Sequence, residues 1–136
     1  MQIRHQNREI YFREQTECTQ KYVIPYIEQV LCIKSNLRVL EIGCGEGGNL
    51  KPFLDVGCHC VGIDIDVAQL EKAKAFFANH SLNKNLRLIA NDIYKVSPNE
   101  IGNFDLIILR DVIEHLPNQE LFMHQLKCFM HSESVV

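Results

Sequence analysis

The sequence predicts an open α/β fold, in which a parallel sheet carries helices on both faces and N-terminal helices precede it. Three observations predict this class. Strand and helix patterns alternate from residue 37 onward, the strands are nearly continuous apolar runs, and four glycines lie where the first strand meets the first helix. Parallel strands are buried on both faces, so an uninterrupted apolar strand favours a parallel sheet.

Four strands are predicted, at residues 37–43, 60–65, 86–91 and 104–110. Predicted helices cover residues 49–56, 66–80 and 117–131, while residues 92–103 are expected to be a loop. Asp66 is a good N-cap with Gln69 three positions later, and Gly57 ends the helix before it. In the last helix Phe122, Leu126, Phe129 and Met130 follow helical spacing.

The chain divides into a predicted N-terminal helical segment, residues 1–34, and a predicted ligand-binding domain, residues 35–136. Within the first, Pro25 marks either a kink or the first turn of a new helix. Only four strands are expected, so the outer side of the fourth strand would be an unpaired edge. Either the chain is a fragment of a longer protein, or something else covers that edge; a homo-oligomer would do so.

Composition excludes several function classes. The chain has 136 residues, with 14 Lys and Arg against 17 Asp and Glu, for a net charge of −3. Nucleic-acid binding needs clustered cations, so no nucleic-acid partner is expected. No apolar run is long enough to span a bilayer and the N-terminus lacks the apolar stretch of a secretory signal. These features predict a cytoplasmic protein without a membrane partner.

The six cysteines predict no metal site. None of the pairs has the two-residue spacing of a zinc site, and only Cys58 and Cys60 lie close together in sequence. Cysteines of this kind usually act as small buried hydrophobic residues.

The junction of the first strand and first helix predicts a ligand site. Its glycines occupy positions 43, 45, 47 and 48. Missing side chains let a backbone approach a ligand closely, and ligands of open α/β sheets bind at the carboxyl ends of the strands. Asp64 ends the second strand, 16 residues after Gly48, where an acid can accept both hydroxyls of a ribose. Asp92 follows the third strand; alone it would suit a turn cap. A glycine turn without a ligand is the alternative.

Glu41 indicates which ligand. It lies two residues before Gly43, near the same end of the first strand. A buried carboxylate is costly unless it is paired, and a negatively charged pyrophosphate would gain nothing from it. A ligand with a cationic amino group would be stabilised by this carboxylate.

The segment VLEIGCGEGGNL, residues 39–50, resembles motif I of the class I S-adenosylmethionine-dependent methyltransferases, an acid followed by GxGxG. The segment VGIDID resembles their second motif, and FDLIILRDVIEHL their fourth strand and the loop after it. The resemblance covers residues 37–130 and favours the branch that methylates small molecules. It implies a Rossmann-like fold whose complete sheet has seven strands in the order 3-2-1-4-5-7-6, truncated here after the fourth strand and its helix.

The resemblance implies that S-adenosyl-L-methionine is the cofactor, with S-adenosyl-L-homocysteine as product, and that a small molecule accepts the methyl group. The implied cofactor residues are Glu41, Gly43, Cys44 and Gly45 at the methionine end, Asp64 at the ribose, Ile65, Asp92 and Ile93 around adenine, and Arg110 near the reacting methyl. Arginine is unusual at that last position. From the N-terminal segment, Tyr11, Phe12 or Tyr22 could close over the cofactor, although packing in the core explains each equally well.

Methyl transfer needs a general base only when the acceptor must lose a proton. The candidates are Asp111 and His115, with Glu114 between them; a histidine here can instead orient its loop.

Two alternative functions remain for the whole chain. Gly43, Gly45 and Gly48 also fit the GxGxxG pattern of nicotinamide-dependent oxidoreductases, and a non-catalytic cofactor-binding or scaffolding module could keep the same fold.

Overall fold

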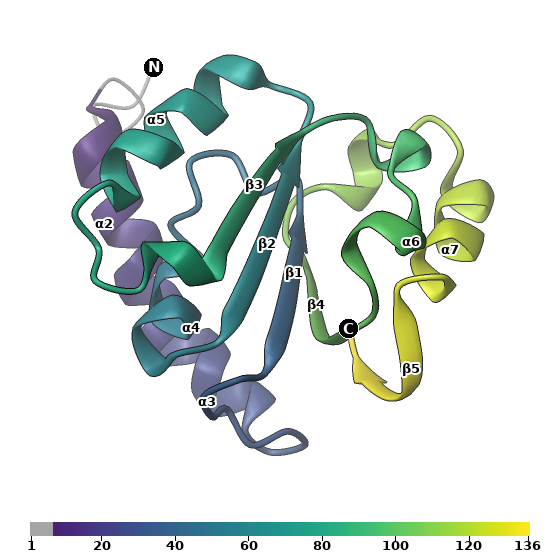
Figure 1. The fold of residues 1–136 in the computed structure, drawn as a ribbon, viewed down its shortest axis with the longest axis horizontal. Helices are drawn as coiled ribbons and strands as arrows, with labels where there is room; N and C mark the ends of the chain where they lie inside the picture. Colours follow the sequence, from purple (N-terminus) through teal and green to yellow (C-terminus); the bar gives the residue numbers. More distant parts are fainter. Residues whose placement is uncertain (1–6) are drawn as a thin grey trace.

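The computed structural model describes residues 7–136 and confirms the predicted parallel α/β fold (Figure 1). A single sheet has the strand order β3-β2-β1-β4-β5, and every neighbouring pair is parallel. The strands are β1 (Arg38–Ile42), β2 (His59–Asp64), β3 (Leu86–Ala90), β4 (Phe104–Leu109) and β5 (Met130–Val135). The chain adds β2 and β3 on one side of β1 and then crosses over to place β4 on the other side. The carboxyl ends of β1 and β4 therefore form a topological switch point.

Helices cover both faces of this sheet (Figure 1). One face carries α2 (Arg8–Cys18), α3 (Ile24–Ile27), α4 (Lys51–Val56) and α5 (Val67–Phe77), and the other α6 (Pro98–Ile101) and α7 (Gln119–Lys127). Each face has its own apolar core. The first centres on Phe53, Leu54 and Phe77, and the second on Phe104, Phe122 and Phe129. None of the helices among residues 7–136 is long and apolar enough to cross a membrane.

The expected strand count was wrong. A fifth strand, β5, pairs with β4 through Phe104–Met130 and Leu106–Val135, so the outer side of β4 is paired within the chain. The preceding helix ends at Lys127, three residues before β5 begins. Met130 therefore belongs to a strand, and Phe129 lies buried in the turn between the two elements. Half of the residues of β5 are exposed and none is buried, and it lacks the apolar run that identified the four predicted strands.

The segment between β3 and β4 is more ordered than the expected loop. It contains the 3-10 turn Ile93–Lys95 and the short helix α6, whose cap Ser97 accepts a hydrogen bond from the Asn99 N–H. Other sequence predictions at helix ends are confirmed. Asp66 caps α5 by accepting from the Gln69 N–H at 3.2 Å, and Gly57 ends α4.

The helix α2 packs on α5 and on the glycine turn that follows β1. Phe12 stacks on Phe76 at 4.5 Å between ring centroids and meets Phe77 edge-on at 5.5 Å. Thr16 Oγ1 donates to the Gly48 carbonyl at 2.9 Å, which fixes α2 on the glycine turn. A π-helical turn, Thr19–Val23, follows α2, and Pro25 lies in the first turn of α3, one of its two expected positions.

Candidate active site

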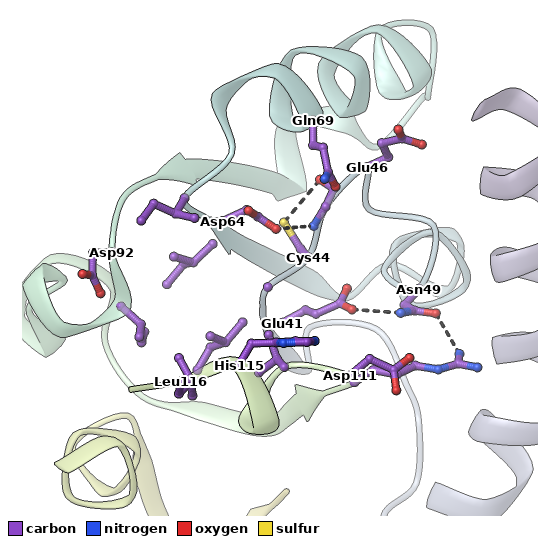
Figure 2. Close-up of a pocket in the computed structure, with 18 of the residues that line it drawn as sticks. Glu41, Cys44, Glu46, Asn49, Asp64, Gln69, Asp92, Asp111, His115 and Leu116 are labelled. Carbon is purple, nitrogen blue, oxygen red and sulfur yellow. Dashed lines mark hydrogen bonds between the residues drawn. The ribbon is translucent and has the colours of Figure 1, made fainter. Parts of the chain in front are cut away.

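A cavity of about 630 Å³ opens at the carboxyl ends of β1, β2 and β4. This volume is within the range of small-molecule and cofactor sites. Its walls come from α2, the glycine turn after β1, the residues that follow β2 and β3, and the loop after β4 (Figure 2). The cavity brings together all eleven predicted site residues: Glu41, Gly43, Cys44, Gly45, Asp64, Ile65, Asp92, Ile93, Arg110, Asp111 and His115.

The glycine turn is held against the end of β2 by its own backbone. The N–H groups of Gly43 and Cys44 both donate to the Ile63 carbonyl, at 2.7 and 3.1 Å. Gly43 has a φ of +72°, and a Cβ there would lie 2.1 Å from Val112 Cγ2. Both the backbone conformation and the lack of space therefore require glycine. Because these N–H groups are in use, the turn can offer a ligand its carbonyl oxygens, which suit a cation.

Asp64 fixes the third residue of that turn. Its Oδ2 accepts from the Gly45 N–H at 2.7 Å, and its Oδ1 accepts from the Asp66 N–H at 2.8 Å. A carboxylate has about four acceptor positions, so each oxygen can accept one further hydrogen bond. Asp64 can thus shape the turn and receive two ligand hydroxyls together.

Glu41 is buried at the base of the cavity, with 1% of its surface exposed (Figure 2). Its Oε1 accepts from Asn49 Nδ2 at 2.9 Å, while Oε2 has no hydrogen-bond partner among residues 7–136. Burial raises the pKa of Glu41 to about 8, although the Asn49 hydrogen bond and the positive charge of Arg110 oppose the rise. An unpartnered buried carboxylate oxygen facing a cavity is matched by a ligand ammonium group.

A second buried acid, Glu46, belongs to the same cavity and was missed by sequence reasoning. Arg8 Nε donates to its Oε1 at 2.5 Å, and the Arg8 guanidinium lies 4.7 Å from the centre of the Tyr11 ring. Glu46 Oε2 has no hydrogen-bond partner in the described part of the chain. Glu46 lies within the glycine turn, but nothing in its position indicated that α2 would supply the partner.

The three aromatic candidates of the N-terminal segment have different places. Tyr11 lines the cavity, Phe12 is buried in the core, and Tyr22 is 62% exposed and is not part of the lining. Packing therefore explains Phe12. Gln15, on the next turn of α2 from Tyr11, also lines the cavity.

The opposite wall of the cavity is apolar. Ile65 is 73% exposed at the rim, and Ile93 is buried behind it. Asp92 lies beside them and caps the turn that follows β3, because its Oδ1 accepts from the Tyr94 N–H at 3.0 Å. An exposed isoleucine at a cavity rim provides a flat apolar surface for a planar ligand group.

The loop after β4 provides the remaining candidates. Asp111 has a φ of +55°, a left-handed conformation that is uncommon outside glycine and concentrates at functional sites. His115 points into the open part of the cavity (Figure 2), with 76% of its side chain exposed. Its ring nitrogen lies 3.7 Å from Glu114 Oε1, beyond hydrogen-bond distance. Neither residue has an activating partner within the described chain, so their catalytic roles stay predictions.

Arg110 makes its contacts with the protein itself. Its Nη1 donates to Asn49 Oδ1 at 3.0 Å and to Thr19 Oγ1 at 3.3 Å, and Nη2 donates to Cys18 Sγ at 3.4 Å. Asn49 and Thr19 were not identified from the sequence. Asn49 lies within the motif-like segment 39–50 but was not singled out there, and Thr19 lies in the π-helical turn, outside any motif.

The cysteines are all unpaired. Burial raises the pKa values of the Cys44 and Cys60 thiols far above the ordinary value, so both stay protonated at neutral pH. Among residues 7–136, no three His, Cys, Asp or Glu side chains are grouped as a metal site requires.

Comparison with known proteins identifies a family. Residues 12–135 match the family model described as a methyltransferase domain. Two similar relatives are ubiquinone biosynthesis O-methyltransferases from Bartonella tribocorum, at 28% identity, and Brucella anthropi, at 30%. Both alignments cover 74% of this chain and 44% of the relative, so the chain spans less than half the length of these proteins.

Solved structures share the fold. PKMT2 from Rickettsia typhi, in complex with AdoHcy, is 26% identical with a TM-score of 0.67; the match covers 73% of this chain and 19% of that one. Coclaurine N-methyltransferase, bound to N-methylheliamine and SAH, is 20% identical with a TM-score of 0.72, over 87% of this chain and 34% of that one. The second match speaks for the fold alone.

Proposed function

Because this chain belongs to the methyltransferase domain family, we propose that its cavity binds S-adenosyl-L-methionine and S-adenosyl-L-homocysteine for methyl transfer to a small-molecule acceptor. The observation that carries the proposal is the buried Glu41, which lines a cavity shared with Asp64 and whose Oε2 has no partner within the described part of the chain. An anion at the base suits the ammonium of the cofactor's amino acid end, and a strand-terminal acid suits its ribose.

The other cofactor residues follow from the lining. Gly43, Cys44 and Gly45 would surround the amino acid end, and the Ile65 and Ile93 surfaces would pack on adenine. Asp92 retains an oxygen that could accept from the adenine amino group. S-adenosylmethionine supplies an already activated methyl group when bound. The protein's task is then to align acceptor and methyl and to exclude water.

The solved structures that share this fold include complexes with AdoHcy, SAM and sinefungin, which supports the cofactor assignment. The relatives act, by name, in ubiquinone biosynthesis as O-methyltransferases, which favours a phenol or other hydroxyl-bearing small molecule as acceptor. A hydroxyl acceptor must lose a proton, and Asp111 or His115 would receive it.

Calorimetric titration of the chain with S-adenosylhomocysteine, with NAD as the control ligand, tests the proposal. S-adenosylhomocysteine cannot react but retains the amino acid, ribose and adenine. Micromolar affinity for it and no binding of NAD is the expected result. Binding of NAD alone would support the oxidoreductase alternative, and no binding by the folded chain would contradict the cofactor site.

A matched pair of variants tests the ribose assignment. Asp64→Ala should weaken S-adenosylhomocysteine binding about 100-fold, since hydrogen bonds to charged groups contribute about 1.5–3 kcal/mol each. Asp66→Asn removes the neighbouring exposed charge but keeps a good helix cap, so its affinity should equal that of wild type. Unchanged affinity in folded Asp64→Ala would refute the ribose role.

A non-catalytic cofactor-binding module is the second candidate. It is favoured by the open side of the cavity, where His115 is largely exposed and no described residue encloses an acceptor. Incubation with S-adenosylmethionine and a small catechol, followed by quantification of S-adenosylhomocysteine, separates the two. Product formation above the catechol-free rate supports the enzyme.

Partner and location assignments remain predictions. The six unpaired cysteines suit a reducing compartment such as the cytoplasm. A homo-oligomer, if formed, would use the outer edge of β5 or β3, because β5 already covers β4.

A further inference from the structure

A buried chain of polar contacts connects the N-terminal helical segment to the base of the cavity. Thr19 Oγ1 and Arg110 Nη1 both donate to Asn49 Oδ1, at 2.7 and 3.0 Å. On its other side, Asn49 Nδ2 donates to Glu41 Oε1 at 2.9 Å (Figure 2). Thr19, Asn49 and Glu41 are each at most 3% exposed. The contacts among the three are therefore shielded from bulk water.

The two donors determine which way the Asn49 amide faces. An amide carries an acceptor oxygen on one side and a donor NH₂ on the other. A hydroxyl such as that of Thr19 can rotate and also accept, but a guanidinium only donates and keeps its charge. A flipped amide would place its NH₂ against Arg110 and its oxygen against the Glu41 carboxylate. Both new contacts would be repulsive.

We propose that Arg110 is a positioning residue: it fixes the Asn49 amide so that Asn49 donates to Glu41, and its charge favours the carboxylate form of Glu41 that the ammonium group of the cofactor would bind. This inference rests on the proposed function and deepens it. It gives the unusual arginine at the end of β4 an indirect role through Asn49, in place of direct contact with the methyl-bearing end.

The charges around Glu41 agree with this role. Burial drives the pKa of Glu41 up, the Asn49 hydrogen bond and the Arg110 charge drive it down, and Asp64 raises it from β2. The thiols of Cys44 and Cys60 are protonated and add no charge. Arg110 is thus the cation whose charge opposes the effect of burial on Glu41.

A lysine could not do the same. The Arg110 guanidinium uses two nitrogens to reach three partners, in α2, the π-helical turn and the turn before α4, whereas a lysine ammonium is a single point on a flexible stem. The π-helical turn brings Thr19 into this network, and such turns occur frequently at functional sites.

The affinity for S-adenosylhomocysteine, measured by calorimetry from pH 6 to 9, tests the proposal. Wild-type affinity should rise about tenfold per pH unit up to the pKa of Glu41, near 8, because binding requires the carboxylate. In Arg110→Met the rise should shift upward by about one pH unit, so that affinity at pH 7 falls about tenfold. The ligand's own amine titrates equally in both proteins, so comparison at each pH cancels it.

Three variants refine the readout. Arg87→Met, which removes an exposed arginine near the start of β3 and outside the cavity lining, should match wild type. In Arg110→Lys the pH dependence of affinity should lie between wild type and Arg110→Met, because lysine restores the positive charge but not the forked guanidinium geometry. Asn49→Asp is isosteric and places a second carboxylate beside Glu41, so it should shift the pH profile of affinity at least as far as Arg110→Met. It keeps the proposal testable if Arg110→Met fails to fold.

Proton release separates positioning from packing. At pH 8 wild type should release about half a proton on binding, and Arg110→Met close to one, measured by calorimetry in two buffers of different ionisation enthalpy. An equal loss of affinity at every pH, with unchanged proton release, would overturn the proposal. A wild-type affinity without pH dependence would overturn it too, while leaving the cofactor assignment in place. No binding by wild type would overturn both.

Discussion

Glu41 combines an electrostatic cost in the free protein with the binding role proposed for it in the complex. Its buried carboxylate has one hydrogen bond, and its other oxygen has no partner among residues 7–136. Because the pKa is raised by burial, the folded state binds a proton that the unfolded state has already lost above its ordinary pKa. The contribution of Glu41 to stability is therefore greatest at low pH and falls as pH rises from about 4.5 to about 8.

Replacing this charge tests the account. Glu41→Gln replaces the buried charge by a neutral amide of the same shape, so it should stabilise the ligand-free protein at pH 8 by on the order of 1–3 kcal/mol. It should also weaken S-adenosylhomocysteine binding at that pH. Urea unfolding at pH 6 and pH 8 measures the first effect, and the gain should be smaller at pH 6. A variant less stable than wild type at pH 8 would contradict the cost assigned here.

Sequence reasoning found the residues whose role depends on strand position. Glu41, Asp64 and Asp92 lie at or near strand ends, and parallel strand ends meet at one edge. Asn49, Glu46 and Arg8 were missed because their partners come from elements distant in sequence. Arg8 and Glu46, for example, are 38 residues apart.

At the scale of elements, α2 is both a core helix and a cavity wall. Its buried Phe12 contacts two rings of α5, while Tyr11 and Gln15 face the cavity. Packing on one side of the helix therefore sets the position of the ligand-facing side.

Removing that packing should affect both properties. Phe12→Ala should cost about 3 kcal/mol of stability, typical of a buried aromatic side chain, and should weaken S-adenosylhomocysteine binding. Tyr26→Ala, at a 74% exposed position of α3, should stay within about 0.5 kcal/mol of wild type with full affinity. Denaturant unfolding and calorimetry give the two quantities. Full affinity in Phe12→Ala would show that α2 does not shape the site.

Asp105 joins three strands at the other end of the sheet. Its Oδ2 accepts from the Arg38 N–H at 2.8 Å in β1, and its Oδ1 lies 2.8 Å from His131 Nε2 in β5. His131 Nδ1 accepts from the Glu133 N–H, so Nε2 carries the proton and donates to Asp105. Burial raises the pKa of Asp105, but these hydrogen bonds outweigh it and hold the pKa below its usual value.

The pH dependence of this contact has a definite sign. A lowered carboxyl pKa contributes stability that is complete above the ordinary pKa, near 4, and is lost as pH falls through the folded value. Asp105→Asn should therefore lose about 1 kcal/mol at pH 7, a figure reduced for partial exposure, and should approach wild type below pH 4. Chemical unfolding across pH 3 to 7 measures it, with the exposed Glu71→Gln as control. A difference that persists unchanged at pH 3 would contradict the assignment.

The elements also show where the sequence signal ends. The four strands β1 to β4 are predominantly apolar runs and were predicted. Half of the residues of the edge strand β5 are exposed, and its pairing with β4 is a tertiary event that apolar periodicity cannot indicate. The helix α6 has only four residues, between a proline and a glycine, and is too short to show helical periodicity, so its sequence predicts a loop.

In the molecule as a whole, the cavity is lined by the N-terminal helix α2 but not by the C-terminal strand β5. Its lining includes residues of α2 and of the loops after β1, β2, β3 and β4, but none of β5. A ligand that binds there would connect the N-terminal helical segment to the sheet and leave the C-terminal strand unaffected. Stabilisation by the cofactor should therefore be large overall yet uneven along the chain.

S-adenosylhomocysteine at 100 times its dissociation constant should stabilise the fold by about 2.7 kcal/mol and raise Tm by about 10 °C for a chain of this size. Hydrogen exchange should slow in α2, because its side chains close the cavity. The edge strand β5 exchanges through local opening and should change little. NAD at the same concentration is the control and should leave both Tm and exchange unaltered. Equal protection of α2 and β5 would mean that the ligand acts only on global unfolding, and that α2 is held no more firmly by the ligand than the far edge of the sheet.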